Sequence, residues 1–190
     1  CMKYKKFILF LVGFVLVYFA HTIINNFFIQ IITNIGGTSA DMGNAVFVAA
    51  MLELPTMAFF TKMSEKINCG TLIKFSILMF CVKHALTYFA TNMIMIYLAQ
   101  VCQMFAYALF VPASVYYVNE KIAVADRVKG QSLVTTSMTL SGVFANFAGG
   151  IMLDALGVGH VLLAGVVLSI VGVILSIVGA VIVILTTEKV

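Results

Sequence analysis

Six long apolar stretches, separated by short interruptions, constrain the fold of this chain more than any other feature. They lie near residues 7–32, 42–61, 71–90, 93–118, 130–150 and 158–186. Each is about 20 residues or longer, which lets a helix rising 1.5 Å per residue cross about 30 Å of hydrocarbon. We therefore expect an all-α membrane protein, in which residues 1–190 form a single bundle of six transmembrane helices.

The composition supports lipid as the solvent of these helices. Hydrophobic residues make up 63% of the 190 residues and charged residues only 9%, whereas soluble domains carry about 25% charged residues. A water-soluble core of this size could not bury so much apolar surface. We therefore expect an integral protein of a bacterial-type plasma membrane.

The basic residues alternate along the chain in a way that fits six crossings. Of the 11 Lys and Arg residues, all but Lys83 fall at the two ends of the chain or in every second connection. By the positive-inside rule, that side is cytoplasmic and both termini lie there. The small, separated basic groups do not form the continuous stripe of a nucleic-acid-binding protein, so we expect no nucleic-acid partner.

Two ionisable residues interrupt the apolar stretches at matching depth. Glu53 lies nine positions from Lys62, and Lys83 lies nine positions from Lys74. Both therefore sit about 13–14 Å deep, near the middle of the bilayer. Each alone would cost roughly 2.5–3.5 kcal/mol, so they could offset one another. We predict a proton-coupling group of Glu53, Lys83 and the adjacent His84; a purely structural ion pair or a neutral buried Glu remains the alternative.

Polar side chains form stripes on three of the predicted helices. The amides of the first and fourth favour a lined cavity, since amides and aromatic residues suit a neutral, hydroxyl-rich ligand. The Ser and Thr residues of the fifth (Ser132, Thr135, Thr136 and Thr139) instead favour bonds to their own backbone. The predicted substrate-binding residues are His21, Asn25, Asn26, Gln30, Gln100, Gln103, Tyr107 and Asn146.

The remaining features indicate structure rather than chemistry. Gly165, Ser169, Gly172, Ser176 and Gly179 predict a close-packing seam on a supporting sixth helix. Pro55 and Pro112 lie within apolar stretches, where we expect bends rather than helix ends.

The sequence also argues against catalysis. No HExxH pattern, no ligand-spaced Cys/His group and no phosphate-binding Gly-rich loop occurs in it. His21 and His84 lie on different predicted helices without a nucleophile at hand. We therefore expect no enzymatic activity, no metal and no cofactor.

Four short stretches resemble the second half of a major facilitator superfamily transporter. They are VNEKIAVADRVKGQSL after the fourth helix, AGGIMLDALGV after the fifth, ELP at Glu53–Pro55 and GGTSADMG at Gly36–Gly43. The resemblance covers about residues 6–185 and is closest to the lactose-permease-like branch of proton-coupled sugar and nucleoside symporters. It implies one six-helix half, with a 3+3 inverted repeat, of a twelve-helix protein whose substrate site lies between the halves.

The resemblance also implies residue roles. An acidic residue on the second helix of this half helps to bind sugar and couple protons, which matches Glu53, and a basic residue on the third matches Lys83. The superfamily's acidic residue on the fourth helix has no match, since Gln100 and Gln103 are the nearest polar groups. The loop motif between the second and third helices is degraded to KMSEKINCG. A cytoplasmic latch, or equally a solvated loop, is predicted from Glu65, Lys66, Asp126, Arg127, Gly130 and Gln131.

Together these features predict the C-terminal half of a secondary active transporter for a small neutral polar solute, a sugar or nucleoside. Proton coupling would pass through Glu53 by alternating access. The expected partners are lipid, the solute, and either an N-terminal six-helix half or a second copy of this chain. The alternative is an interaction module that pairs with itself or a partner and transports nothing. The sequence leaves the substrate, the coupling ion and the direction of transport open.

Overall fold

The computed structural model describes residues 5–156 together with residues 174, 178, 181–182 and 184–185. The predicted sixth span and its small-residue seam therefore lie almost wholly outside the described residues.

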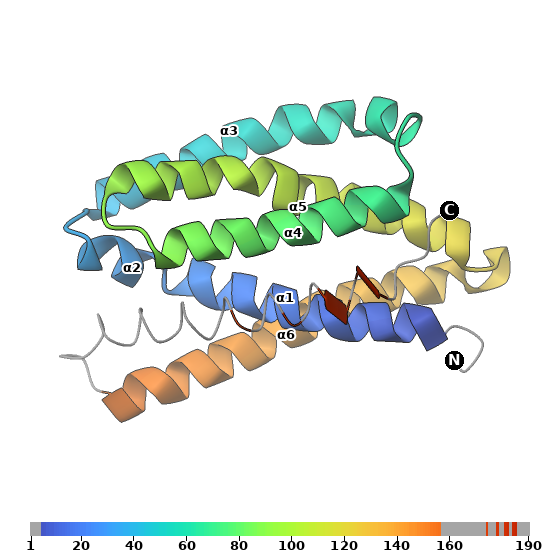
Figure 1. Cartoon of the computed structure of the whole chain (residues 1–190). Coiled ribbons are helices and arrows are strands. Elements are labelled where there is room, and N and C mark those ends of the chain that lie inside the picture. Colours follow the sequence, from blue (N-terminus) through green and yellow to red (C-terminus); the bar gives the residue numbers. More distant parts are fainter. Residues whose placement is uncertain (1–4, 157–173, 175–177, 179–180, 183, 186–190) are drawn as a thin grey trace.

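The described elements are all helices, and the long ones lie side by side lengthwise (Figure 1). The start of α1, the α3–α4 connection and the α5–α6 connection meet at one end of the bundle. This end carries Lys62, Lys66, Lys121 and Lys129, and we refer to it as the basic end. The elements are α1 (Lys5–Asn26), α2 (Phe28–Asn34), α3 (Ser39–Ser64), α4 (Cys69–Tyr88), α5 (Met93–Lys121), the short 3-10 helix η2 (Val124–Asp126) and α6 (Arg127–Leu156).

Three helices, α3, α4 and α5, are each long and apolar enough to cross a membrane. The pair α1 and α2 would make a fourth span if taken together. The predicted fifth span forms α6, which has 30 residues and carries many hydroxyl and Gly residues. The described part of the chain thus accounts for three of the predicted segments as spans, or four if α1 and α2 form one span, and the six-span count and the inverted repeat stay predictions.

Local sequence explains where several helices begin. The Thr38 side chain and Asp41 form a capping box at the start of α3, in which the Thr38 amide donates to Asp41 Oδ2 at 2.8 Å. Asn68 accepts from the Gly70 amide at 2.8 Å before α4, and Asn92 accepts from the Met95 amide at 3.1 Å before α5. These side chains satisfy amides that the first helical turn leaves without partners. The connections are therefore short and well defined.

The two prolines lie inside helices that continue past them, as the sequence predicted. Pro55 is in the middle of α3 and Pro112 is in the second half of α5. Proline removes one backbone hydrogen bond from a helix, but neighbouring turns and packed helices maintain both elements. Neither proline marks the boundary of an element.

The α5 helix lies at the centre and packs most extensively against α4 and α3, while α1 packs against α6. The α1–α6 contact uses small residues on α6: Ser137, Ser141, Ala145 and Gly149 are buried at steps of four. Ser141 Oγ also lies 3.1 Å from the Val15 carbonyl oxygen on α1. Small residues at this spacing let two helix backbones approach closely in lipid, so α6 carries a seam of the kind predicted for residues 158–186.

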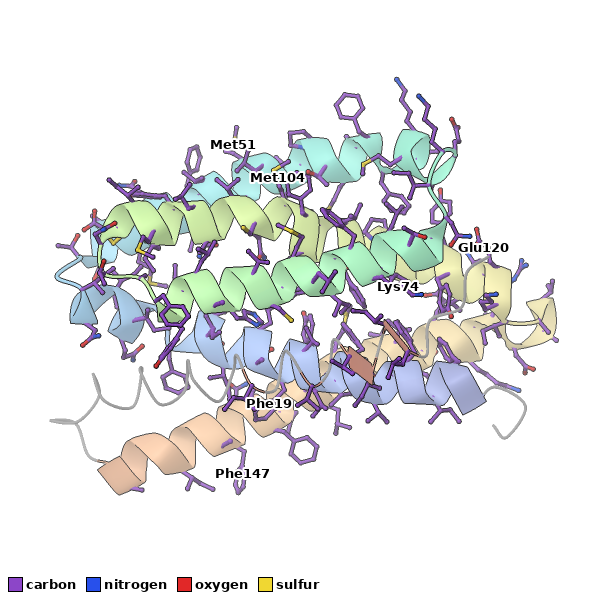
Figure 2. The ribbon with its side chains drawn as sticks, in the orientation of Figure 1. Phe19, Met51, Lys74, Met104, Glu120 and Phe147 are labelled. Carbon is purple, nitrogen blue, oxygen red and sulfur yellow. The ribbon has the colours of Figure 1, made fainter. Side chains whose placement is uncertain are left out.

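An aromatic core fills the space between α1, α4 and α5 on the side of the basic end. Phe14 and Phe110 stack with ring centroids 4.4 Å apart and planes 7° apart. By contrast, Met51 on α3 and Phe147 on α6 point away from the bundle (Figure 2), and Phe147 is 68% exposed. The members of the aromatic core are Phe10, Phe14, Phe80, Phe110 and Tyr117.

The first predicted span differs from a single continuous helix. The chain bends by 59° between α1 and α2, and the residue at the break, Phe27, has φ −102° and ψ 20°. No Gly or Pro is present there, so the sequence carried no usual signal for a bend. The Phe27 ring at this break packs against Gly149 of α6.

Candidate functional site

A cavity of about 290 Å³ opens among α1, α2, α3, α4 and α5. It brings together Glu53 and Lys83 and three of the amides that the sequence singled out. Most of the remaining wall is apolar. The lining residues are Asn25, Phe28, Met42, Val46, Ala49, Ala50, Glu53, Lys83, Gln100 and Gln103.

The two ionisable residues share this cavity without forming a direct pair. Lys83 is only 1% exposed, and its Nζ donates to Gln103 Oε1 at 2.6 Å. Glu53 is half-buried and close enough to attract the Lys83 charge. Within the described residues, no ion pair joins Glu53 to Lys83. The buried ammonium therefore has a neutral protein partner, and the carboxylate faces the cavity, which leaves both groups able to meet a polar ligand.

The amides of the cavity come from two helices. Gln100 and Gln103 are one turn apart on α5 and are 4% and 7% exposed, so they point inward rather than to the outer face. Asn25 lies near the end of α1 and bonds His21, with Asn25 Nδ2 and His21 Nε2 2.9 Å apart. Each amide has donor and acceptor atoms without net charge. The arrangement suits the hydroxyl or carbonyl groups of an uncharged solute.

Behind the cavity wall lies a buried polar layer, which we define as His21, Lys83, His84 and Gln103. The His21 ring stacks on His84 and on Tyr107, with centroids 5.9 Å apart in both cases. His84 is fully buried, and neither of its ring nitrogens has a hydrogen-bond partner. His21 and Tyr107 thus support the cavity from behind, and neither they nor His84 are among its lining residues.

Three predicted substrate-binding residues lie apart from the cavity. Asn26 Nδ2 donates a short hydrogen bond to Asn146 Oδ1, which joins α1 to α6. Gln30 is on α2, half-buried, with its Oε1 atom buried and unpartnered. The predicted substrate-binding residues therefore fall into three groups: those that line the cavity, those that support it, and the Asn26–Asn146 pair between α1 and α6. Gln30 belongs to none of these groups.

The hydroxyl residues of the fifth predicted helix bond mainly to their own backbone, as the sequence predicted. Thr135 and Thr139 each donate to the carbonyl four residues earlier, both at 3.2 Å, and Ser132 donates to Val128 at 2.9 Å. These side chains are exposed on α6. Their hydroxyl hydrogens are therefore already used within the helix.

The predicted latch residues lie at the basic end in two groups, one at the end of α3 and one at the start of α6. Gln131 Nε2 donates to the Val115 carbonyl on α5 at 2.9 Å. A Cβ atom at Gly130 would lie 2.8 Å from Val118 Cγ1, so Gly130 allows α6 to approach α5. Arg127 is half-buried at the start of α6. These residues make α5–α6 contacts; Glu65 and Lys66 are exposed at the end of α3.

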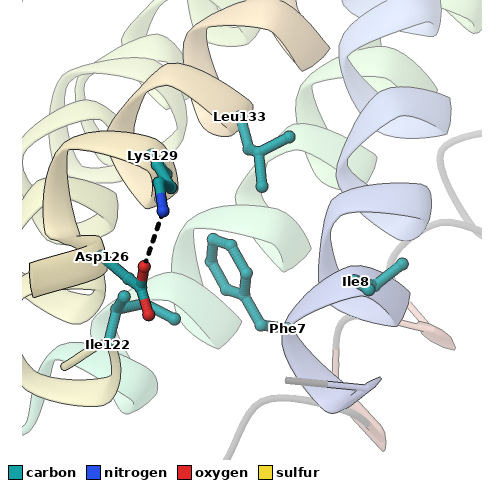
Figure 3. Close-up of a pocket in the computed structure, with 7 residues that line it drawn as sticks. Phe7, Ile8, Ile122, Asp126, Lys129 and Leu133 are labelled. Atoms are coloured by element: carbon teal, nitrogen blue, oxygen red, sulfur yellow. Dashed lines mark hydrogen bonds and ion pairs between the residues drawn. The ribbon is translucent and has the colours of Figure 1, made fainter. Parts of the chain in front are cut away.

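A second, smaller cavity of about 170 Å³ also lies at the basic end (Figure 3). Its apolar walls come from α1, from α6 and from Ile122, the residue after α5, and they include Phe7 and Leu133. Its polar edge is the ion pair between Asp126 and Lys129, with Nζ and Oδ1 3.1 Å apart. The pair is largely exposed, so it contributes little to stability.

The sequence interpretation missed the apolar part of the main cavity. Met42, Val46, Ala49 and Ala50 precede Glu53 by 11, 7, 4 and 3 positions, which places all five on one helical face. This spacing could have identified them once Glu53 was chosen. Phe28 could not have been found in this way, because its position depends on the bend between α1 and α2.

The chemistry available at the site is that of binding. In the part of the chain that the structure describes, no group of three or more His, Cys, Asp or Glu side chains is arranged to hold a metal ion. The cavity holds one carboxylate, one ammonium and three amides. Such a set can bind a polar solute through hydrogen bonds and charge.

Comparison with known proteins gives one match. The family model of the Major Facilitator Superfamily matches residues 10–189. No curated protein and no solved structure matches the chain.

Proposed function

This chain belongs to the major facilitator superfamily of membrane transporters, and we propose that it moves a small neutral polar solute, such as a sugar or nucleoside, coupled to protons. The observation that carries the proposal is the cavity that holds Glu53, Lys83 and three amides at one site. Placing charged and amide side chains around a cavity does not stabilise an integral membrane protein. Their cost is explained if the space receives a ligand.

The solute class follows from the available hydrogen-bonding groups. Gln100, Gln103 and Asn25 offer both donors and acceptors, and Phe28 and Met42 supply apolar wall. A solute with several hydroxyl or carbonyl groups can satisfy the amides while its ring contacts the apolar surface. A hydrocarbon solute would leave the remaining donors and acceptors of these amides unpaired, which is costly in a dry site.

Glu53 is the proposed coupling residue. It is half-buried and reaches the cavity, whereas Lys83 is buried and bonded to Gln103. When Glu53 is ionised, its charge offsets that of Lys83; when it is protonated, it becomes a neutral donor for the solute. Binding of a proton and of the solute would then favour each other at the same site, which is the requirement for symport.

We further propose that transport requires a second helical bundle, either an N-terminal six-helix half or another copy of this chain. Alternating access depends on two bundles that rock against each other around a central site. The exposed residues Val46 and Ala50 lie on the same cavity wall as Glu53. A second bundle placed against this side would close the cavity.

Uptake into proteoliposomes tests the proposal. The chain is reconstituted alone and with a candidate partner half, a proton gradient is applied, and a panel of sugars and nucleosides is offered. We expect accumulation only when two bundles are present, and Glu53→Gln should abolish accumulation while solute exchange continues. Glu120→Gln, at an exposed carboxylate near the end of α5 and away from the cavity, is the matched control and should accumulate normally.

Two results would contradict parts of this proposal. Proton-driven accumulation by the Glu53→Gln variant would remove Glu53 from the coupling role. Absence of binding and transport for every panel member, with either partner, would favour an assembly module that does not transport.

A further inference from the structure

The bend between α1 and α2 needs a cause outside its own sequence. Sharp bends in helices usually occur at Pro, at Gly or Ser pairs, or at a bulge. The residues around this break are Asn25, Asn26, Phe27 and Phe28, and the bend is 59°. The contacts of these residues with α6 supply the missing cause.

The Phe27 ring lies against Gly149 of α6, in space that a side chain on any other residue at position 149 would fill. A Cβ atom built on Gly149 of α6 would lie 2.5 Å from Phe27 Cζ, well inside the 3.5–4.0 Å at which carbon atoms attract. Phe27 is 7% exposed and clusters with Ile23 and Ala145. The absence of a side chain at Gly149 therefore leaves room for the ring of Phe27, the residue at which the helix breaks.

A second contact lies one residue away. The amide of Asn26 donates to the side-chain oxygen of Asn146, one turn before Gly149 on α6. Both asparagines are otherwise exposed. An apolar contact and a polar contact thus attach the break to the same stretch of α6.

The two residues that flank these contacts form part of the cavity wall. Asn25 is the next-to-last residue of α1 and Phe28 is the first residue of α2. Both line the cavity. Because they belong to helices that meet at the bend, their relative placement depends on its angle. Asn25 is also oriented by His21, whereas no side-chain hydrogen bond can orient Phe28.

We propose that Asn146 and Gly149 are positioning residues, which hold the α1–α2 break and so set where Asn25 and Phe28 lie in the cavity wall. They would control the affinity for the solute without touching it. The affinity part rests on the proposed function, whereas the placement of the wall does not. The two parts can therefore fail separately.

Thiol labelling measures the placement of the wall directly. Phe28→Cys is introduced in a background whose native cysteines are replaced by Ser, and the rate of reaction with N-ethylmaleimide is measured in detergent. Phe28 is 3% exposed, so labelling should be slow. Adding Gly149→Ala should raise the rate roughly tenfold, because the displaced ring of Phe27 opens the break.

Matched variants separate positioning from general damage. Gly142→Ala lies on the same helix, where an added Cβ would meet nothing within 4 Å, and should leave the rate unchanged. Phe27→Leu combined with Gly149→Ala should return the rate towards its starting value, because the shorter side chain fits beside the new methyl group. A thiol placed at Val46, which lines the cavity from α3, should label equally in all of these variants.

Asn146→Ala tests the polar contact without placing new atoms near the break, so it stays informative if Gly149→Ala fails to fold. It should raise labelling at position 28 several-fold. Thr139→Ala, two turns earlier on the same exposed face and bonded only within its own helix, is its control. Unchanged labelling in Asn146→Ala, together with unchanged labelling in any folded Gly149→Ala, would overturn the positioning role.

The solute panel then tests the affinity part. Under the proposed function, Asn146→Ala should raise the KM for uptake with little change in the maximum rate. If labelling changes but the KM does not, Asn146 and Gly149 position the cavity wall, and the proposed effect on solute affinity is wrong. Lack of uptake by the unaltered protein is a failure of the proposed function alone, and the labelling result still decides the positioning role.

Discussion

The aromatic core and the polar layer share α1, α4 and α5, but they differ in how fully their side chains are satisfied. In the aromatic core, Phe14 and Phe110 stack tightly and are both 0% exposed. In the polar layer, Lys83 has one neutral partner and His84 has none for either ring nitrogen. The aromatic core is closely packed, whereas the polar layer contains buried polar atoms that have no hydrogen-bond partner and add nothing to the packing.

The difference indicates that the two regions have different roles. In lipid, helices associate through packing and interhelical hydrogen bonds, and the aromatic core supplies close packing near the basic end. The polar layer lies directly behind the cavity and shares Lys83 and Gln103 with it. Stability should therefore depend mainly on the aromatic core, and ligand binding mainly on the polar layer.

The largest effect on stability is expected from the aromatic core. Phe110→Ala removes a ring that stacks on Phe14 and contacts Phe10 and Phe80, and it should lower the free energy of unfolding by about 3 kcal/mol. The measurement is equilibrium unfolding in mixed detergent micelles. Phe147→Ala, on an exposed side chain, should change it by less than about 0.5 kcal/mol. Equal effects of the two variants would mean that the core does not provide the stability assigned to it.

A smaller loss of stability is expected from breaking the hydrogen bond between Lys83 and Gln103 in the polar layer. Gln103→Leu leaves the buried Lys83 ammonium without its acceptor and should cost about 1.5–3 kcal/mol in the same unfolding experiment. Adding Lys83→Met should recover most of this loss, because an apolar pair leaves no unpaired charge. If the double variant is less stable than Gln103→Leu alone, Lys83 contributes to stability through a contact other than the one with Gln103.

The smallest effects should distinguish the two histidines. His21→Leu breaks the bond to Asn25 and should cost about 1 kcal/mol, whereas His84→Leu should be neutral or slightly stabilising, because it replaces unpaired ring nitrogens. Thermal unfolding of the two variants, side by side, provides the comparison. A marked loss of stability in His84→Leu would show that this ring is structurally required and that the polar layer is more completely satisfied than its contacts indicate.

Periodicity and depth identified much of the candidate site in advance. The equal distances of Glu53 and Lys83 from the basic residues predicted that they share a level, and both line one cavity. The inward amide stripe of α5 was also visible, because Gln100 and Gln103 are three residues apart. These features depend on the geometry of single helices, which a sequence reports well.

Other features depended on how two helices meet, and they were not predicted. Asn26 and Asn146 were expected to bind solute, but they bond each other across α1 and α6. The break at Phe27 was not foreseen, because no Gly or Pro lies near it to signal a bend. A pattern along one helix contains no information on which residue of another helix will lie opposite.

The amino-acid sequence by itself determined that this chain forms apolar helices and that an acid and a base lie at the same depth within them. A helix has a constant rise and turn, so distance along the chain converts directly into depth and direction. Only the tertiary structure decided that Lys83 bonds Gln103 rather than Glu53, and that the first span bends at Phe27, whose ring packs on Gly149 of α6. Those outcomes depend on the relative rotation and separation of packed helices, which side-chain fit between distant segments determines.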